Sequence, residues 1–339
     1  MKAIVYSEAG GSDVLRLVER PDPEPGPGDV RVRIHVSGVN PTDWKARRGA
    51  RGGELPFPEL VPNQDGAGVI DAVGDGVSSS RIGERVWLWE AAWQRADGTA
   101  QGCVVLPARQ AVVLPDDASF DLGASLGIPA LTAQLCLTAA LDGPRSLAAG
   151  ALDGRTVLVA GGAGAVGHAA IQLARWAGAH VIATVSTDEK AALARAAGAD
   201  AVVSYRGGAA AEEVRGHAPD GVDLIVEVAP AVNAELDAEV VAPNGTVAVY
   251  AADGGAGVAA EQWPLMQKNV SYRFVLVYTV SDAAKDQAVA DVSTALADGA
   301  LPVGEEAGLP LHRFSLERTG DAHDAVEAGA VGKVLVDVG

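Results

Sequence analysis

The segment Thr156–Lys190 constrains the fold more than any other part of this 339-residue chain. A short apolar run, Val157–Val159, leads into the pattern Gly162-x-Gly164-x-x-Gly167, and apolar residues at helical spacing follow. The first glycine permits a tight turn, the second lets a pyrophosphate approach the backbone, and the third lets the helix pack closely on the strand. Because a strand precedes the glycines and a helix and a second strand follow them, a chance match is the weaker explanation. The predicted phosphate-binding residues, at the turn and the helix N-terminus, are Gly162, Gly164, Ala165, Val166 and Gly167.

The second strand of this unit, Val181–Val185, ends without the carboxylate that would bind the ribose hydroxyls of NAD. Its tip carries Ser186 and Thr187, and Lys190 stands one helical turn further on. Hydroxyls and an ammonium suit a 2′-phosphate, since charge-assisted hydrogen bonds to phosphate are strong, so the tip predicts NADPH. A simpler alternative, compatible with the first, is that Ser186 or Thr187 caps the next helix and that Lys190 is a solvated surface cation.

Composition and charge exclude several classes of function. The net charge of −18 disfavours binding to nucleic acid or to anionic membranes, because their phosphates would be repelled. No run approaches 18 uninterrupted apolar residues and the N-terminus has no signal-peptide pattern, so we expect a cytoplasmic protein. Cys103 and Cys136 are too few to indicate a disulfide framework or a metal site, and we expect reduced core thiols.

The order of predicted elements indicates an α/β chain with two domains. Short apolar runs with period-2 alternation, separated by Pro- and Gly-rich turns, continue to about residue 114 and predict an antiparallel, barrel-like β domain. Six strand candidates then alternate with helices, the last of them Tyr272–Tyr278, which predicts a doubly wound, six-stranded parallel Rossmann domain. We expect residues 128–298 to form the Rossmann domain and residues 1–127 with 299–339 to form the β domain. A loop is expected over Ala252–Ala260.

Several further motifs, in order along the chain, resemble the zinc-free quinone oxidoreductase (zeta-crystallin-like) branch of the medium-chain dehydrogenases and reductases. They are GVNPTDWK at 38–45, PNQDGAGVIDAVG at 62–74, LGIPALTA at 126–133 and GKVLVDVG at 332–339. The resemblance implies a GroES-like catalytic domain beside the Rossmann domain, with a cleft between them. It also implies a homodimer, or a tetramer, joined along the edge strand 272–278.

The resemblance supplies three catalytic candidates. It places Asn40 beside the nicotinamide as an amide donor. Lys45 stands where the family often has a tyrosine, and in this it is similar to polyketide enoyl reductases, in which such a lysine and a threonine matching Thr132 stabilise or protonate an enolate. The alternatives are that Lys45 is a solvent-facing cation and that the Thr132 hydroxyl bonds back to its own helical turn.

Other site candidates come from the same resemblance and from the ends of strands. Tyr205 matches a family tyrosine near the adenosine phosphate, while Tyr250 and Ala251 follow the fifth strand of the parallel sheet and are expected to approach the nicotinamide. Lys333 is a candidate cofactor contact, with a surface lysine at a strand start as the alternative. The tryptophans of the 87–93 segment suit an aromatic substrate wall, although we expect at least two of them to be core residues.

The residues argue against a metal. Zinc alcohol dehydrogenases carry a cysteine where this chain has Asn40 and a Gly-His-Glu where it has Asn63-Gln64-Asp65, and the six histidines are scattered. We therefore expect a zinc-independent reductase that transfers hydride from NADPH to quinones or to activated C=C bonds. The alternatives are an enoyl reductase dedicated to a thioester or polyketide intermediate, and a non-catalytic, crystallin-like NADPH-binding protein.

Overall fold

The computed structural model describes residues 1–50, 52, 55–255, 257–258 and 261–339. The chain divides into two compact units, Met1–Ile128 with Leu311–Gly339 and Pro129–Pro310. The loop expected over 252–260 lies partly outside the described residues. Within the described part of the chain, one helix, α2 (Phe120–Leu137), is long and apolar enough to cross a membrane, but 78% of it is buried inside the protein, as in a core helix.

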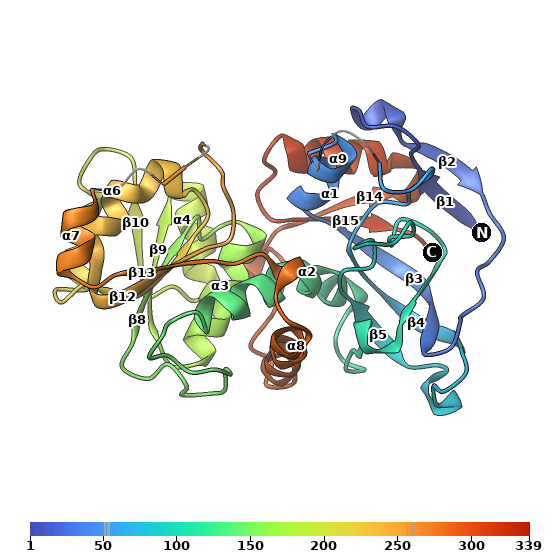
Figure 1. The fold of residues 1–339 in the computed structure, drawn as a ribbon, viewed down its shortest axis with the longest axis horizontal. Coiled ribbons are helices and arrows are strands. Elements are labelled where there is room, and N and C mark those ends of the chain that lie inside the picture. Colours follow the sequence, from blue (N-terminus) through green and yellow to red (C-terminus); the bar gives the residue numbers. More distant parts are fainter. Residues whose placement is uncertain (51, 53–54, 256, 259–260) are drawn as a thin grey trace. The chain divides into compact units, whose positions relative to one another are not determined.

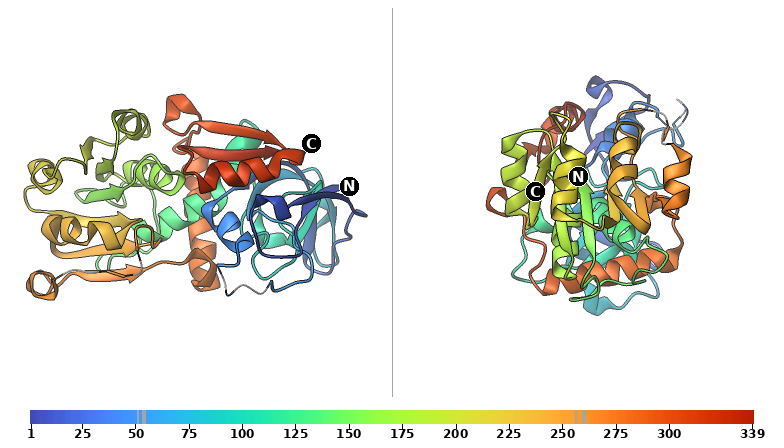
Figure 2. Two further views of the ribbon diagram at one scale, coloured as in Figure 1. Left: turned by 90° about the horizontal axis from the view of Figure 1, so that it is seen from above. Right: turned by 90° about the vertical axis from the view of Figure 1, so that its left-hand side faces the viewer.

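The first unit is built on a mostly antiparallel sheet whose strands run in the order β14-β15-β3-β4-β5-β7, with β14 parallel to β15, β6 paired to β3 and a separate β1–β2 pair (Figure 1). The C-terminal strand β15 completes it by pairing antiparallel with β3, so that Val334 faces Val39, and Figure 2 shows the red C-terminal elements lying against the blue N-terminal ones. The chain therefore returns to its first domain, as expected, and β14 and β7 are strands that the sequence analysis did not anticipate. The bounds are β1 Lys2–Val5, β2 Arg16–Glu19, β3 Asp29–Val39, α1 Pro41–Arg47, β4 Asp65–Val73, β5 Arg85–Leu88, β6 Cys103–Pro107, β7 Ala111–Val113, β14 Leu311–Ser315, α9 Thr319–Glu327 and β15 Lys333–Asp337.

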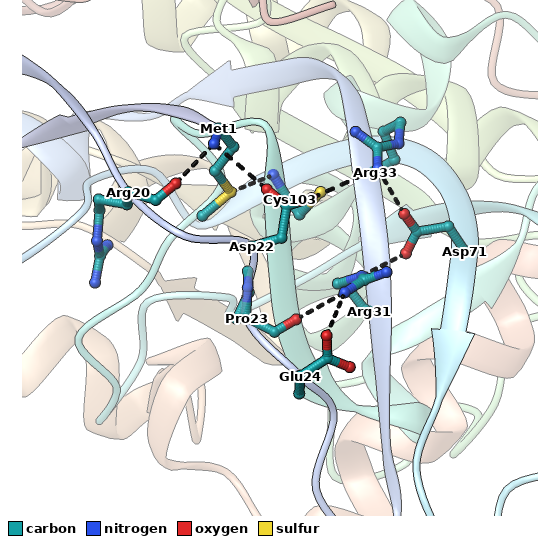
Figure 3. Close-up of polar contacts among 9 residues, drawn as sticks. All are labelled: Met1, Arg20, Asp22, Pro23, Glu24, Arg31, Arg33, Asp71 and Cys103. Atoms are coloured by element: carbon teal, nitrogen blue, oxygen red, sulfur yellow. Dashed lines mark hydrogen bonds and ion pairs between the residues drawn. The ribbon is translucent and has the colours of Figure 1, made fainter.

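The N-terminus is tied to this sheet by polar contacts (Figure 3). The Met1 ammonium donates to the carbonyl oxygen of Arg20 at 2.7 Å and lies 3.4 Å from a carboxylate oxygen of Asp22. Cys103, on β6, donates its backbone N–H to the Met1 sulfur at 3.2 Å, and its own side chain is buried. Burial raises the pKa of the Cys103 thiol and of the Cys136 thiol, so both remain protonated core thiols.

The second unit confirms the predicted Rossmann architecture. Within the described residues, six parallel strands run in the order β10-β9-β8-β11-β12-β13, which is the doubly wound order with its switch point between β8 and β11 (Figure 1). Apolar side chains fill its core because strands buried on both faces by crossover helices are apolar throughout. The bounds are β8 Thr156–Ala160, α3 Ala165–Trp176, β9 His180–Val185, α4 Asp188–Ala196, β10 Ala201–Ser204, α5 Ala210–His217, β11 Val222–Glu227, α6 Pro230–Val240, β12 Val241–Val249, α7 Gln262–Gln267, β13 Ser271–Phe274 and α8 Asp282–Ala297.

The expected edge strand, Tyr272–Tyr278, is wrong at its C-terminal end. The strand stops at Phe274 because its partner β12 ends at Val249, which accepts a hydrogen bond from the Val275 N–H at 2.8 Å. Val277–Thr279 then forms a 3₁₀ turn instead of extended chain.

The second boundary between the units falls after Pro310, later than the sequence analysis placed it. The residues that follow α8, up to Pro310, belong to the Rossmann unit because side chains of α3 form hydrogen bonds with them. Gln172 donates to the Pro302 carbonyl at 2.9 Å, and a His168 ring nitrogen lies 2.8 Å from the Ala307 carbonyl.

Candidate active site

The glycine turn after β8 has the geometry of a dinucleotide-binding loop. Gly161 adopts a φ of +68°, which only glycine takes at no steric cost. A Cβ on Gly162 would lie 2.8 Å from the Ala183 side chain, and one on Gly167 would overlap the Gly161 carbonyl oxygen. At Gly164 the nearest atom beyond the adjoining residues is that same oxygen, 3.5 Å away. The first and third glycines therefore serve packing, whereas the second leaves open space beside the backbone.

Helix α3 begins directly at this open side. Gly164 is its N-cap residue in extended conformation, and its carbonyl accepts the first helical hydrogen bond, from the His168 N–H at 2.7 Å. The amides of Ala165, Val166 and Gly167 lie in the first turn, where an α-helix leaves its N–H groups without internal acceptors. Such a helix start attracts phosphate through these donors and through the helix dipole.

Ser186, Thr187 and Lys190, the residues proposed for a 2′-phosphate, lie at the end of β9 and in the first turn of α4. Thr187 caps α4, since its hydroxyl oxygen accepts a hydrogen bond from the Lys190 N–H at 3.3 Å. Ser186 is partly exposed. Tyr205 lies beside this tip, because its N–H donates to the Val185 carbonyl at 3.1 Å, and its side chain is 47% exposed.

Arg206 is a candidate that the sequence analysis missed. It follows Tyr205, it is exposed, and it forms no ion pair with a described residue. The signal that could have revealed it is its position, one residue beyond the tyrosine that the family resemblance had already singled out. An arginine is a bidentate phosphate ligand, so the tip offers two cations instead of one.

The ends of β11 and β12 lie side by side. Tyr250 donates its N–H to the Glu227 carbonyl at 3.0 Å, and Tyr250 and Ala251 line a cavity in the Rossmann unit. The Glu227 carboxylate is buried, and it accepts hydrogen bonds from the Ala229 N–H and from the Asn233 amide, the latter at 3.0 Å. Burial and the neighbouring Glu227 raise the pKa of Asp237 to about 9, so Asp237 is protonated at neutral pH. Its protonation removes the charge repulsion between these two buried acidic side chains.

In the first unit, Asn40, Asp65 and Lys333 form a buried network. The Lys333 ammonium lies 2.7 Å from the Asn40 side-chain oxygen and 3.2 Å from a carboxylate oxygen of Asp65, and both charged side chains are at most 1% exposed. The Asn40 amide donates to the same Asp65 oxygen at 2.6 Å, and the other Asp65 oxygen accepts the Ile128 N–H at 2.8 Å. Lys333 is therefore not the surface lysine of the alternative interpretation.

This network fixes the orientation of the Asn40 side chain. Its oxygen is occupied by an ammonium and one amide N–H by a carboxylate, which leaves the second N–H without an acceptor among the described residues. The Asn40 backbone N–H donates to the Asp43 carboxylate at 2.7 Å at the start of α1. Burial raises the pKa of Asp43 to about 8 and raises that of Asp65, and in both cases the Lys333 ammonium opposes the increase.

Lys45 and Thr132 belong to different units. Lys45, on α1, is partly buried, and its ammonium lies 5.6 Å from the centre of the Trp44 ring, a cation–π distance. Thr132, on α2, is 5% exposed, and its hydroxyl has no hydrogen-bond partner among the described residues, so it does not bond back to its own turn. Trp87 and Trp89 are fully buried core residues, as expected, and Trp93 is partly exposed.

The positions at which zinc alcohol dehydrogenases hold their metal do not fit zinc in this chain. Asn40, Gln64 and Asp65 offer one carboxylate, which the Lys333 ammonium already neutralises. Across the described residues, no group of three or more His, Cys, Asp or Glu side chains is arranged to hold a metal ion. The group beside this carboxylate is thus the Lys333 ammonium, which is not a zinc ligand.

Comparison with known proteins agrees with this architecture. Residues 26–116 match the protein-family model of the alcohol dehydrogenase GroES-like domain, and residues 165–294 match the one described as zinc-binding dehydrogenase. Quinone oxidoreductase of Lama guanicoe is 30% identical over 347 residues, which cover 99% of this chain and 97% of the relative.

Two solved structures have similar folds over their whole length. A mycobacterial protein complexed with NADPH has a TM-score of 0.82 at 30% identity, covering 99% of this chain and 100% of the other. An NAD-dependent alcohol dehydrogenase has a TM-score of 0.87 at 28% identity, covering 100% of both chains. Taken with the full-length similarity to quinone oxidoreductases, these matches show that the chain belongs to the zeta-crystallin-like branch of the medium-chain dehydrogenases and reductases.

Proposed function

We propose that this protein is a zinc-independent reductase that uses NADPH to reduce quinones or activated C=C bonds. The observation that carries the proposal is the glycine turn, which leaves space beside Gly164 and leads to a strand tip without an acid. Because NADPH and NAD differ at the ribose 2′-position, the Thr187 and Lys190 side chains at that tip favour the phosphorylated cofactor. Similarity to quinone oxidoreductases and to an NADPH complex supports the same reaction class.

NADPH supplies a hydride, and the protein must position the acceptor and stabilise the charge that develops on it. On an enone, the hydride forms a C–H bond at the β-carbon, the C=C π bond breaks, and the electron pair moves to the carbonyl oxygen as an enolate. A proton then adds at the α-carbon, and NADP⁺ is left. On a quinone, the oxyanion of the hydroquinone takes the proton.

We assign the oxyanion donor to Asn40, whose second amide N–H is unused while Lys333 and Asp65 hold the side chain in place. Lys45 is the proposed source of the proton, with Thr132 as a second donor. Ser186, Thr187, Lys190, Tyr205 and Arg206 are the proposed contacts of the adenosine 2′-phosphate, and Tyr250 and Ala251 those of the nicotinamide. Lys333 has a third N–H, which its two acceptors do not use and through which it could contact the cofactor.

Replacing Lys190 by alanine should raise the KM for NADPH by about tenfold or more, because a charge-assisted hydrogen bond to the 2′-phosphate is lost. The KM for NADH should stay nearly unchanged. Steady-state kinetics with both cofactors measure the two values. Arg195→Ala, at the other end of the same helix, is the matched control, and equal changes for NADPH and NADH would contradict the 2′-phosphate assignment.

The test of the function is the rate of NADPH oxidation with ortho- and para-quinones, enones and enoyl thioesters, with products identified by mass. Rapid reduction of quinones alone supports a general quinone reductase, and saturated products support an ene-reductase. In the second case Lys45→Ala should lower kcat for enones by about 10²-fold or more, the usual contribution of a positioned acid, with little effect on NADPH affinity. Unchanged turnover of enones would mean that Lys45 is a solvent-facing cation and does not supply the proton. Binding of NADPH without reduction of any acceptor would contradict the proposed function and favour a non-catalytic role.

We also propose a homodimer formed along β13, with a tetramer as the alternative. This strand is the edge of the Rossmann sheet, and an unpaired edge offers backbone donors and acceptors to a second copy. Phe274 on the strand and Leu276 just beyond it are 67% and 51% exposed. Native mass spectrometry of the full chain distinguishes monomer, dimer and tetramer.

A further inference from the structure

A cavity of about 1370 Å³ lies in the Rossmann unit beside the ends of β12 and β13. Much of its wall is apolar, with Leu135, Val249 and Leu276 among the lining side chains, and Thr138 adds a hydroxyl. Pockets for small ligands usually measure roughly 300–1000 Å³. This cavity is larger and partly open to solvent, so it has room both for the nicotinamide and for an acceptor longer than a bare quinone ring.

Two arginines, Arg145 and Arg273, line the same cavity. Both are exposed and neither forms an ion pair with a described residue, unlike Arg175, which pairs with Asp200 at 2.5 Å. The chain has 44 acidic and 26 basic residues, yet none of the residues lining the cavity is an aspartate or a glutamate. The cavity is thus a locally positive site on a strongly acidic protein, and such a site concentrates anions.

We propose that this cavity holds the anionic end of the acceptor, so that the preferred substrate is an α,β-unsaturated carbonyl compound bearing a carboxylate or a phosphate. The inference rests on the proposed reductase function and specifies its substrate class. A neutral quinone offers the two guanidinium groups only carbonyl oxygens, whereas a carboxylate or a phosphate accepts the stronger, charge-assisted hydrogen bonds.

The position of the cavity relates the anion to the reaction. Tyr250 and Ala251, the proposed nicotinamide contacts, also line it. An acceptor bound with its acidic group on Arg145 and Arg273 extends along the apolar wall, and its conjugated end lies on the side of Tyr250. Binding energy at a group remote from the reacting carbons then serves to position them.

The experiment compares anionic substrates with matched neutral ones. One pair is 8-oxo-6-nonenoate and its methyl ester, in which four methylene groups separate the acid from the conjugated end, and it tests a carboxylate. The other is the crotonyl thioester of 4′-phosphopantetheine and that of pantetheine, which tests a phosphate. Phosphopantetheine lacks the adenosine of coenzyme A, so this substrate does not compete with NADPH for the dinucleotide site.

We expect the wild-type protein to prefer the anionic member of at least one pair by about tenfold or more in kcat/KM, the value of one charge-assisted contact. The double variant Arg145→Gln/Arg273→Gln should remove this preference, and Arg273→Lys should retain part of it because the charge remains. The preference should also decrease as ionic strength rises. Arg215→Gln is the control, since Arg215 pairs with Glu239 on the surface and does not line the cavity.

An equal preference in the wild type and in the double variant would overturn the proposal. So would a change of oligomeric state without a change of preference, because the arginines would then belong to a subunit interface at β13. Failure of the reductase function is separable from failure of this inference. Binding of 8-oxononanoate and of butyryl-4′-phosphopantetheine, which have no C=C bond to reduce, is measured by calorimetry. It should weaken in the double variant even if no acceptor is turned over.

Discussion

Replacing Lys333 by methionine is expected to lower the free energy of unfolding by about 3–5 kcal/mol, the usual result of removing one partner of a buried ion pair. The Asp65 carboxylate, fully buried, then loses the ammonium that lies 3.2 Å away. Methionine has a side chain of similar length to lysine and keeps the packing, so the loss of stability reflects the missing positive charge. Urea denaturation followed by circular dichroism measures it.

The pH dependence gives this prediction a second readout. Without Lys333, only the hydrogen bonds from Asn40 and Ile128 oppose the effect of burial on Asp65, and its pKa in the folded state rises further above the value in the unfolded chain. A carboxyl with a raised folded pKa destabilises the protein increasingly as the pH rises above its unfolded pKa. The deficit of the variant should therefore shrink towards acidic pH, and adding Asp65→Asn should recover most of it.

The exposed pair of Lys2 with Glu317, at 2.8 Å, supplies the control. Lys2→Met should leave the denaturation midpoint almost unchanged, because solvent screens an exposed ion pair. If the Lys333→Met protein were as stable as the wild type, the Lys333 ammonium would not be needed to compensate the buried charge of Asp65. At temperatures where the variant is folded, an unchanged Kd for NADPH would also remove Lys333 from the proposed cofactor contacts.

The role of Lys333 shows what the sequence alone could not provide. Its partner Asn40 is 293 positions away, and the contact exists because β15 pairs with β3 in a register that sets Val334 against Val39. Nothing in the local pattern GKVLVDVG at 332–339 encodes that register. The position was identified as a candidate through the family resemblance, but its burial and its partners follow from long-range pairing of strands.

The Rossmann unit could be predicted in detail because its signals are local. The turn after β8 needs its glycines at set positions, and strands buried on both faces are apolar throughout. The end of β13 could not be predicted, since it depends on where β12 stops. The cavity with Arg145 and Arg273 was missed for the same reason, because residues separated by more than a hundred positions form it.

The three fingerprint glycines are expected to respond differently to the addition of one methyl group. On Gly167, a Cβ would overlap the Gly161 carbonyl oxygen, so Gly167→Ala should damage the turn and the fold together. On Gly164, the nearest atom beyond the adjoining residues is 3.5 Å away and the backbone φ is −82°, which alanine adopts without strain. The methyl group would then lie only in the space that the pyrophosphate is proposed to occupy.

Gly164→Ala should therefore fold with only the small loss of stability that alanine causes at an N-cap position. It should bind NADPH with a Kd raised by about tenfold or more, a loss of about 1.4 kcal/mol or greater. Isothermal titration calorimetry measures the affinity, and thermal unfolding without cofactor measures the stability. Gly216→Ala is the control, because a Cβ there meets nothing within 4 Å and the glycine lies on helix α5, so affinity should not change. NADPH should raise the melting temperature of the control and of the wild type equally, and that of Gly164→Ala much less. An unchanged Kd in Gly164→Ala would mean that the dinucleotide does not pass over this turn, and the second glycine would then have no binding role.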